Sequence, residues 1–111
     1  MFEIYVSPSD NHFYFRLKAR NGQIILTSQG YKSRKACETG IASVQKNAGD
    51  EGRFEVKTAR NGKLFFNLLA ANKQVIGTSQ MYGSPAAVKK GMASVMTNAA
   101  GSTVKDLTAA Q

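Results

Sequence analysis

The sequence predicts an α+β fold of two tandem repeats, merged into one antiparallel sheet with both helices on one face. Its 111 residues can form one shared core, whereas two independent halves without disulfides or metal would be marginal. Shifted by 51 positions, residues 13–48 align with 64–99, and 18 of these 36 positions are identical, which indicates an internal duplication. Strand-like alternation precedes a helix-like stripe in each copy. We therefore expect one domain, 1–111, whose repeats (1–51 and 52–111) are related by an approximate twofold axis.

The first repeat begins with a three-stranded meander. Residues 2–6 alternate between apolar and polar side chains, as a half-buried strand does. In residues 13–19 Phe15 and Leu17 alternate with polar neighbours. Asn21-Gly22 favours a two-residue hairpin turn, because both residues tolerate positive φ. A third strand is predicted at 23–29.

A helix follows in each repeat. Ser33 and its counterpart Ser84 are predicted N-caps, because a hydroxyl can accept a hydrogen bond from an amide of the first turn. Gly49 is placed to end the first helix in a left-handed conformation. Gly40 and Gly91 lie on the apolar stripes of both helices, and mid-helix glycine is costly. We expect each helix to approach the sheet closely there.

The second repeat repeats this order, with strands at 54–58, 63–70 and 74–80 and a helix at 85–99. The weak alternation of residues 103–107 predicts a last strand. The tetrapeptide Ala-Arg-Asn-Gly occurs at 19–22 and again at 59–62, but its spacing lies outside the repeat register. We interpret it as two turns of similar chemistry.

The repeated pattern T-S-x-x-Y followed by G-(I/M)-x-S-V-x-x-N-A, over residues 2–99, resembles the YegP-like family of small bacterial proteins of unknown function. The resemblance implies tandem β3-α-β motifs whose final strands are exchanged between the units. On that basis residues 54–58 join the first unit's sheet to the second, and residues 103–107 are the last strand. Members of that family often carry glutamate after the Thr-Ser pair, where this chain has Gln29 and Gln80. That departure counts against acid–base chemistry there, and the family implies no activity.

Composition argues against several function classes. The single cysteine, Cys37, excludes an internal disulfide, and the lone histidine, His12, has no partner in the other repeat. No zinc spacing, P-loop or dinucleotide motif is present, so we expect neither metal nor cofactor, and no enzyme. Neither a signal peptide nor a membrane-spanning run is recognisable, so we expect a cytoplasmic protein.

Net charge is +8 and lies mainly in the second repeat, with 8 basic and 2 acidic residues after position 51. Such an excess attracts polyanions without defining a function.

The sheet face that the helices leave open is the first candidate binding surface. It is predicted to carry aromatic, basic and apolar side chains, namely Tyr5, Tyr14, Arg16, Lys18, Lys57, Phe65, Asn67 and Leu69. Three explanations stay open: contact with a protein partner or a second copy, mere sheet propensity, or stacking of nucleic-acid bases.

The repeated turns are the second candidate. They comprise Thr27, Ser28, Gln29 and Tyr31 with their counterparts Thr78, Ser79, Gln80 and Tyr82. We favour a structural role, in which Ser and Gln satisfy backbone groups and Tyr packs its ring; a pocket between sheet and helix would instead support a small-molecule site. The sequence thus predicts a non-enzymatic binding or interaction module acting through the open sheet face, with nonspecific single-stranded nucleic-acid binding as the alternative.

Overall fold

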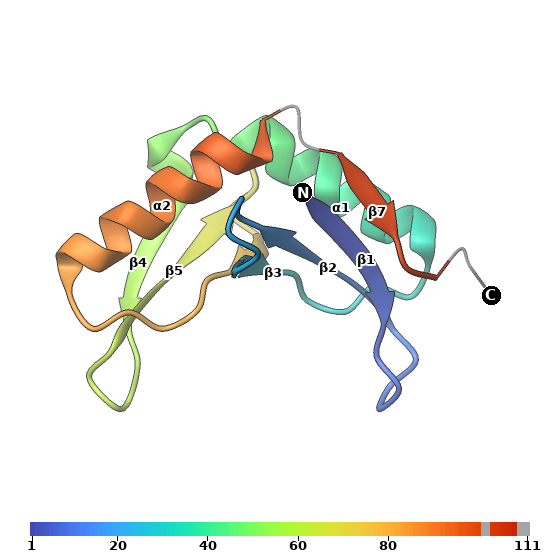
Figure 1. Ribbon diagram of the computed structural model, residues 1–111, viewed down its shortest axis with the longest axis horizontal. Helices are drawn as coiled ribbons and strands as arrows, with labels where there is room; N and C mark the ends of the chain where they lie inside the picture. The colour runs from blue at the N-terminus through green and yellow to red at the C-terminus, as the bar shows by residue number, and fades with distance from the viewer. Residues whose placement is uncertain (101–102, 109–111) are drawn as a thin grey trace.

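In the computed structural model, which describes residues 1–100 and 103–108, seven strands form one sheet and two α-helices cover one of its faces (Figure 1). The strands are β1 (Phe2–Val6), β2 (Phe13–Lys18), β3 (Ile24–Thr27), β4 (Phe54–Thr58), β5 (Leu64–Leu69), β6 (Val75–Thr78) and β7 (Val104–Asp106). The helices are α1 (Arg34–Asn47) and α2 (Pro85–Ala99), and a 3-10 turn, η1 (Glu51–Arg53), precedes β4. The predicted α+β class and the common helix face are confirmed.

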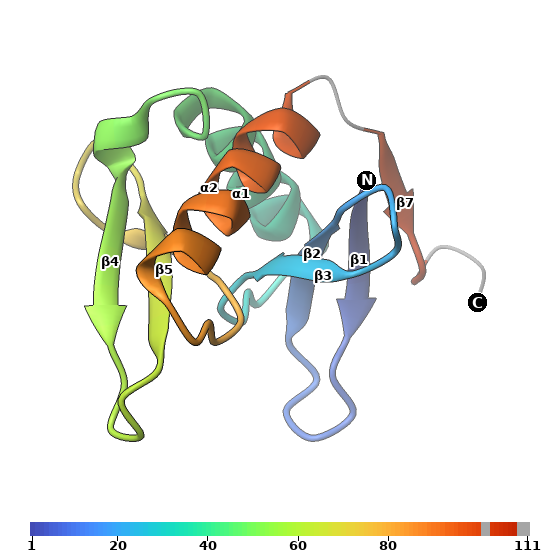
Figure 2. The same ribbon diagram turned by 60° about the vertical axis from the view of Figure 1, so that its left-hand side comes forward.

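The two repeats meet at β3 and β6 in the strand order β4-β5-β6-β3-β2-β1-β7. These strands pair antiparallel through Thr27 and Thr78, which are equivalent in the repeats, so the approximate twofold axis passes between them. The implied exchange of final strands is confirmed, because β4 follows the first repeat's helix and pairs in the second repeat, while β7 pairs with β1 of the first. The prediction that residues 54–58 join the two sheets is wrong. This strand is β4, which pairs with β5 and lies at one edge of the sheet (Figure 2). The third strands make the junction because each ends its meander with an edge that needs a partner.

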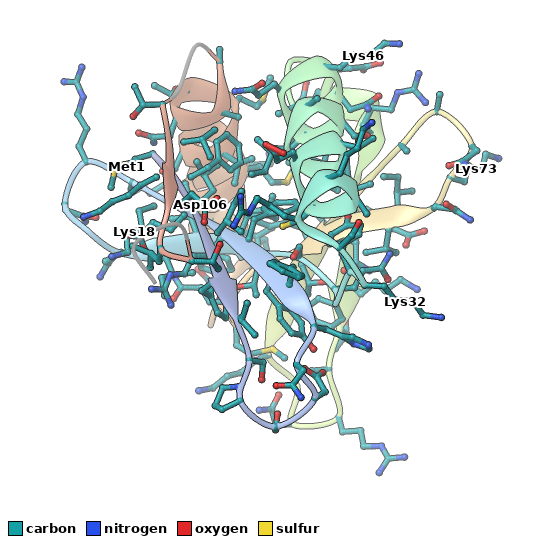
Figure 3. All side chains as sticks on the ribbon, turned by 90° about the vertical axis from the view of Figure 1, so that its right-hand side faces the viewer. Met1, Lys18, Lys32, Lys46, Lys73 and Asp106 are labelled. Atoms are coloured by element: carbon teal, nitrogen blue, oxygen red, sulfur yellow. The ribbon has the colours of Figure 1, made fainter. Side chains whose placement is uncertain are left out.

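The predicted last strand is confirmed as β7, which pairs parallel with β1, so the sheet is mixed and not purely antiparallel. A parallel pair needs a long crossover, and the chain between β1 and β7 supplies it. Phe2 N–H donates to the carbonyl of Thr103 and Leu107 N–H to that of Ile4, both at 2.9 Å. Asp106, which is labelled in Figure 3, forms an ion pair with Arg34, and this pair connects β7 to the first turn of α1.

The turn at Asn21-Gly22 contains one more residue than predicted. Ala19 N–H donates to the carbonyl of Gln23 (2.9 Å), which leaves a three-residue loop in place of the expected two-residue turn. Only Gly22 adopts positive φ (+83°), while Asn21 Oδ1 accepts a hydrogen bond from Gln23 N–H. This loop type requires a single left-handed residue. The Ala-Arg-Asn-Gly stretch at 59–62 forms the same loop in the β4–β5 hairpin, so our interpretation of that tetrapeptide holds.

The helix starts follow the prediction. Ser33 Oγ accepts a hydrogen bond from Ala36 N–H at 3.1 Å, and Ser84 Oγ accepts one from Ala87 N–H at 3.2 Å. Each hydroxyl therefore satisfies an amide that the helix itself cannot pair.

The predicted role of Gly49 is wrong. Helix α1 ends at Asn47, and Ala48 caps it in a right-handed conformation (φ −67°) with its N–H bonded to the carbonyl of Val44. Gly49 does not adopt a positive φ angle. Because Ala48 ends the helix in a right-handed conformation, no left-handed residue is needed there.

One core joins the repeats, since each helix packs on strands of both: α1 on β2 and β6, α2 on β5 and β3. The internal symmetry is broken beside the axis, where Leu26 and Gly77 occupy equivalent positions. A Cβ atom at Gly77 would lie 2.7 Å from Leu26 Cγ. Only one of these two positions can therefore carry a large side chain.

Each mid-helix glycine faces a tyrosine ring, which confirms the predicted close approach. A Cβ atom at Gly40 would lie 2.8 Å from Tyr31 Cζ, and one at Gly91 would lie 2.5 Å from Tyr82 Cζ. Both rings also stack on a core phenylalanine of the sheet. The tyrosines of the repeated turns are therefore packing residues between helix and sheet.

Candidate functional site

The open face, meaning the sheet face opposite the helices, has one polar row that crosses all seven strands. Cross-strand pairing aligns Glu55, Asn67, Thr78, Thr27, Arg16, Glu3 and Lys105. Seven of the eight predicted surface residues alternate with buried core residues of their strands and so lie on this face. The eighth, Lys57, lies there because it pairs directly with Phe65 across β4 and β5. The two repeats, however, arrange them differently.

In the first-repeat half (Tyr5, Tyr14, Arg16 and Lys18) the side chains bind one another. The rings of Tyr5 and Tyr14 stack with centroids 5.7 Å apart, and the Arg16 guanidinium lies 4.7 Å from the Tyr5 centroid. Arg16 Nε donates to Glu3 Oε1 at 2.8 Å, and Lys18 Nζ lies 3.3 Å from the same oxygen. Both cations of this half are therefore neutralised by a carboxylate within the molecule.

Glu3 is the centre of that network. Its side chain is only 7% exposed, so its charge must be compensated locally. The hydrogen bond from Arg16, supported by Lys18, holds the pKa of Glu3 below its ordinary value although burial opposes this shift.

The Tyr14 hydroxyl is also engaged. It donates to Asp10 Oδ2 at 2.6 Å, and His12 N–H donates to Asp10 Oδ1 at 3.0 Å. The bond to Tyr14 lowers the pKa of Asp10 and raises that of Tyr14. This contact anchors the first hairpin loop to the open face, which leaves Tyr14 less able to bind a ligand.

The second-repeat half (Lys57, Phe65, Asn67 and Leu69) lacks this network. Asn67 stands where the first repeat has Arg16; it is 8% exposed, and its Oδ1 accepts the Thr78 hydroxyl at 2.8 Å. Lys57 Nζ lies 3.6 Å from Glu55 Oε1, and both side chains are about half exposed. Phe65 and Leu69 replace Tyr14 and Lys18 and remain partly exposed. This half therefore exposes two apolar side chains, and its one ion pair is long and exposed to solvent.

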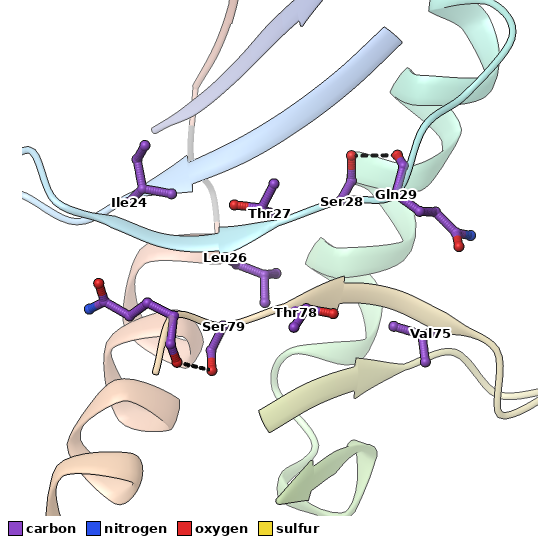
Figure 4. A pocket seen from close by; sticks show the side chains of 9 residues that line it. Ile24, Leu26, Thr27, Ser28, Gln29, Val75, Thr78 and Ser79 are labelled. Carbon is purple, nitrogen blue, oxygen red and sulfur yellow. Dashed lines mark hydrogen bonds between the residues drawn. The ribbon is translucent and has the colours of Figure 1, made fainter. Parts of the chain in front are cut away.

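Between the halves lies a central cleft of about 430 Å³ on the sheet at the junction of β3 and β6 (Figure 4). Its lining is almost symmetric about the axis and consists of Ile24, Leu26, Thr27, Ser28 and Gln29 with Val75, Thr78, Ser79 and Gln80. One end carries Ile24 and Ser79, and the other carries Val75 and Gln29 (Figure 4). The cleft has amides and hydroxyls but no charged group.

The repeated turns divide between this cleft and the core. Ser28 Oγ accepts from Phe15 N–H and donates to the carbonyl of Gln29, both at 2.9 Å, so the predicted structural role of the serine is confirmed. The glutamines do not follow the prediction, since Gln29 and Gln80 are exposed at the cleft. Tyr31 and Tyr82 do not line this cleft, but Tyr82 and Gln80 line a separate hollow of about 280 Å³ between the sheet and α2.

Sequence reasoning missed two apolar residues of the cleft. Ile24 is 39% exposed and Val75 is partly exposed. A register shift between β2 and β3 pairs Ile24 with Lys18, and the equivalent shift between β5 and β6 pairs Val75 with Leu69. Ile24 and Val75 therefore lie on the open face. Simple alternation along 23–29 could not reveal a bulge, although matching β-branched residues at the two positions were a usable signal.

The described part of the chain contains no group of three or more potential metal ligands. Burial raises the pKa of Cys37 to about 11, so its thiol is unsuited to nucleophilic chemistry. Among the described residues no helix is long and apolar enough to cross a bilayer.

Comparison with known proteins identifies the repeat unit. A family model described as a domain of unknown function, DUF1508, matches residues 9–55 and again residues 59–106. The chain belongs to the DUF1508 family. The first matched segment ends within β4 and the second ends with β7, so β4 and β7 are equivalent as the last strands of the two DUF1508 repeats. In its pairing within the sheet, however, β4 is equivalent to β1.

Relatives and solved structures agree with the predicted YegP-like membership. The chain is 57% identical over 99 residues to a UPF0339 protein of Pasteurella multocida, covering 89% of this chain and 87% of that protein. It is 55% identical over 100 residues to the UPF0339 protein YegP of Escherichia coli K12, covering 90% and 91%. The solution NMR structure of E. coli YegP, a protein of unknown function, matches with a TM-score of 0.89 at 54% identity over 96% of this chain and 90% of that one. That of a UPF0339 protein from Shewanella oneidensis matches with a TM-score of 0.88 at 48% identity, covering 96% and 89%.

Proposed function

We propose that this protein is a non-enzymatic binding module, and that it binds a protein partner through the second-repeat half of the open face together with the central cleft. The observation that carries the proposal is the contrast between the halves. The first-repeat half satisfies its own polar groups, whereas the second-repeat half offers Phe65 and Leu69 beside a cleft.

The chemistry of this surface indicates the kind of partner. Phe65, Leu69 and Ile24 present apolar area to solvent, and Gln29 and Gln80 add exposed amides that can donate and accept. An apolar centre with neutral polar groups is the composition of a protein interface. A charged small substrate would find no compensating charge in the cleft lining.

Nucleic acid remains the alternative partner because the net charge is +8. Two features count against it. Arg16 and Lys18 are already paired with Glu3, and Tyr5 is covered by Tyr14 and Arg16. Phosphates and bases would have to displace these contacts.

Site-specific photo-crosslinking in E. coli tests the proposal. The photoreactive residue p-benzoylphenylalanine replaces Phe65 in one variant and its counterpart Tyr14 in the other, which is the matched control. We expect a discrete protein adduct at position 65 and little at position 14. Adducts of equal yield at both positions, or none at position 65, would overturn the assignment. Nuclease-sensitive adducts, with oligonucleotide affinity that falls steeply as salt rises, would favour nucleic acid instead.

Serine substitutions separate binding from folding. Because Phe65 and Leu69 are partly exposed, F65S and L69S should remove the crosslink from a probe placed at Val75 while the urea midpoint changes little. A large loss of stability would show that these side chains belong to the core.

A further inference from the structure

Strand β4 has an unpaired edge. It pairs with β5 on one side, and no described strand lies on its other side (Figure 2). Successive residues of a strand point their backbone groups to alternate sides, and by analogy with β1 the groups of Phe54 and Val56 point outward. Phe54 N–H is already bonded to the carbonyl of Glu51. The carbonyl of Phe54 and both backbone groups of Val56 are therefore available to a further strand.

The equivalent edge of the first repeat is covered. Strand β1 has the same Phe-Glu-apolar sequence as β4, and β7 lies parallel along it. Two backbone bonds of 2.9 Å close the ends of this pair, and Arg34 Nε lies 3.0 Å from Asp106 Oδ2. The pairing of β7 with β1 therefore shows how an edge of this sequence binds a parallel strand.

The uncovered edge also leaves apolar side chains exposed. Val56 is 49% exposed, whereas its counterpart Ile4 on β1 is 1% exposed. Met92 of α2 is partly exposed, whereas its counterpart Ile41, which lines a cavity with Val104 of β7, is 3% exposed. The side chains that β7 helps to bury in the first repeat therefore have exposed counterparts in the second.

A second copy of the chain cannot supply a β7-like strand to both edges. Each chain has two edges of this type, β1 and β4, but the described residues supply one covering strand, β7. Exchange of β7 between copies would cover one edge and expose another. A strand that covers β4 in the way that β7 covers β1 therefore has to come from a different polypeptide.

We propose that the β4 edge binds an extended segment of another protein as an eighth strand, parallel to β4. An apolar side chain of that segment would cover Val56 and Met92, as β7 covers their counterparts. The bound segment needs no carboxylate at the position equivalent to Asp106. In α2 the residue equivalent to Arg34 is Pro85, which has no charge to pair with. Such strand addition obtains affinity from backbone bonds and specificity from alternate side chains. This surface is separate from the open face, so either proposal can fail without the other.

NMR titration of the full-length, isotope-labelled chain with a capped Thr-Val-Lys-Asp-Leu peptide, the sequence of residues 103–107, tests this site. We expect saturable shifts of the amides of residues 54–57 and of the Met92 methyl group. A spin label on the peptide's N-terminus should broaden Phe54 more than Thr58 if the strand is parallel. Absence of shifts at millimolar peptide, shifts confined to Phe2 and Ile4, or stronger broadening of Thr58 would each overturn the proposal.

Proline substitutions provide the matched control. V56P removes the outward N–H of β4 without touching the ladder with β5, and should weaken peptide binding about tenfold, the effect of one lost hydrogen bond. V6P makes the same change on β1 beyond the part that β7 covers, and binding should be unchanged. If V56P does not fold, V56K places a charge at the same exposed position and should also weaken binding. Undiminished binding to V56P or V56K would contradict the proposed geometry.

Discussion

Replacement of Gly91 by alanine tests the packing of the repeated tyrosine against the helix. In most helices this change stabilises by about 1 kcal/mol, because glycine loses more backbone entropy on folding. Here the new Cβ would lie 2.5 Å from Tyr82 Cζ, where ordinary contact begins at 3.4 Å. The ring would have to move by at least 0.9 Å, the difference between these two distances, because the Tyr82 hydroxyl lies closer still.

That movement determines the sign of the effect. Overpacking costs about 1–3 kcal/mol, and displacing Tyr82 from Phe66, on which it stacks with centroids 6.1 Å apart, costs about 0.5–1.5 kcal/mol more. After the helix-propensity gain is subtracted, we expect G91A to lower the free energy of unfolding by about 2 kcal/mol.

Urea unfolding followed by far-UV circular dichroism measures this, since the chain has no tryptophan. In a Tyr82→Ala background the same substitution should become stabilising by about 1 kcal/mol, because the obstructing ring is gone. Gly49, around which a Cβ would meet no atom within 4 Å, is the control and should tolerate alanine. Stabilisation by G91A in the presence of Tyr82 would refute the reasoning.

Two further predictions concern buried titratable groups. E3Q should lower the free energy of unfolding at pH 7 by about 1.5–3 kcal/mol, the range for hydrogen bonds to charged groups. Because the folded-state pKa of Glu3 is lowered, its contribution is complete above the ordinary value of 4.5 and is lost as the pH falls through the folded-state pKa. The difference from wild type in urea titrations should therefore vanish in acid, and a constant difference would contradict the Arg16 pairing. Cys37, whose pKa burial raises to about 11, should react with a thiol reagent at pH 8 only after unfolding in urea; rapid labelling of the folded chain would show that the thiol is accessible.

Much of the fold was predictable because it depends on local pattern. Alternation located the strands, and Ser33 and Ser84 marked the helix starts through hydrogen bonds made within three residues. The turn at Asn21-Gly22 and the stop at Gly49 were wrong in detail, because several loop geometries accept the same residues.

The candidate site was less predictable, because its character depends on pairing across strands. Alternation correctly placed Tyr14 and Phe65 on the open face. It could not reveal that the Tyr14 hydroxyl is hydrogen-bonded to Asp10, whereas Phe65 is partly exposed and has no polar group to bond. Ile24 was missed because a bulge shifts the register of β3.

The sequence by itself determined the duplication, the type of each element and the side chains available to each face, since these follow from residue spacing along the chain. Only the tertiary structure decided that β3 and β6 form the junction and that β4 is left at an edge. The physical reason is that a strand's neighbours are chosen by long-range packing of the whole sheet against both helices. Strand β4 follows a helix as β7 does, but it pairs with β5 as β1 pairs with β2. Because β4 occupies the position equivalent to β1, it cannot also occupy the position equivalent to β7.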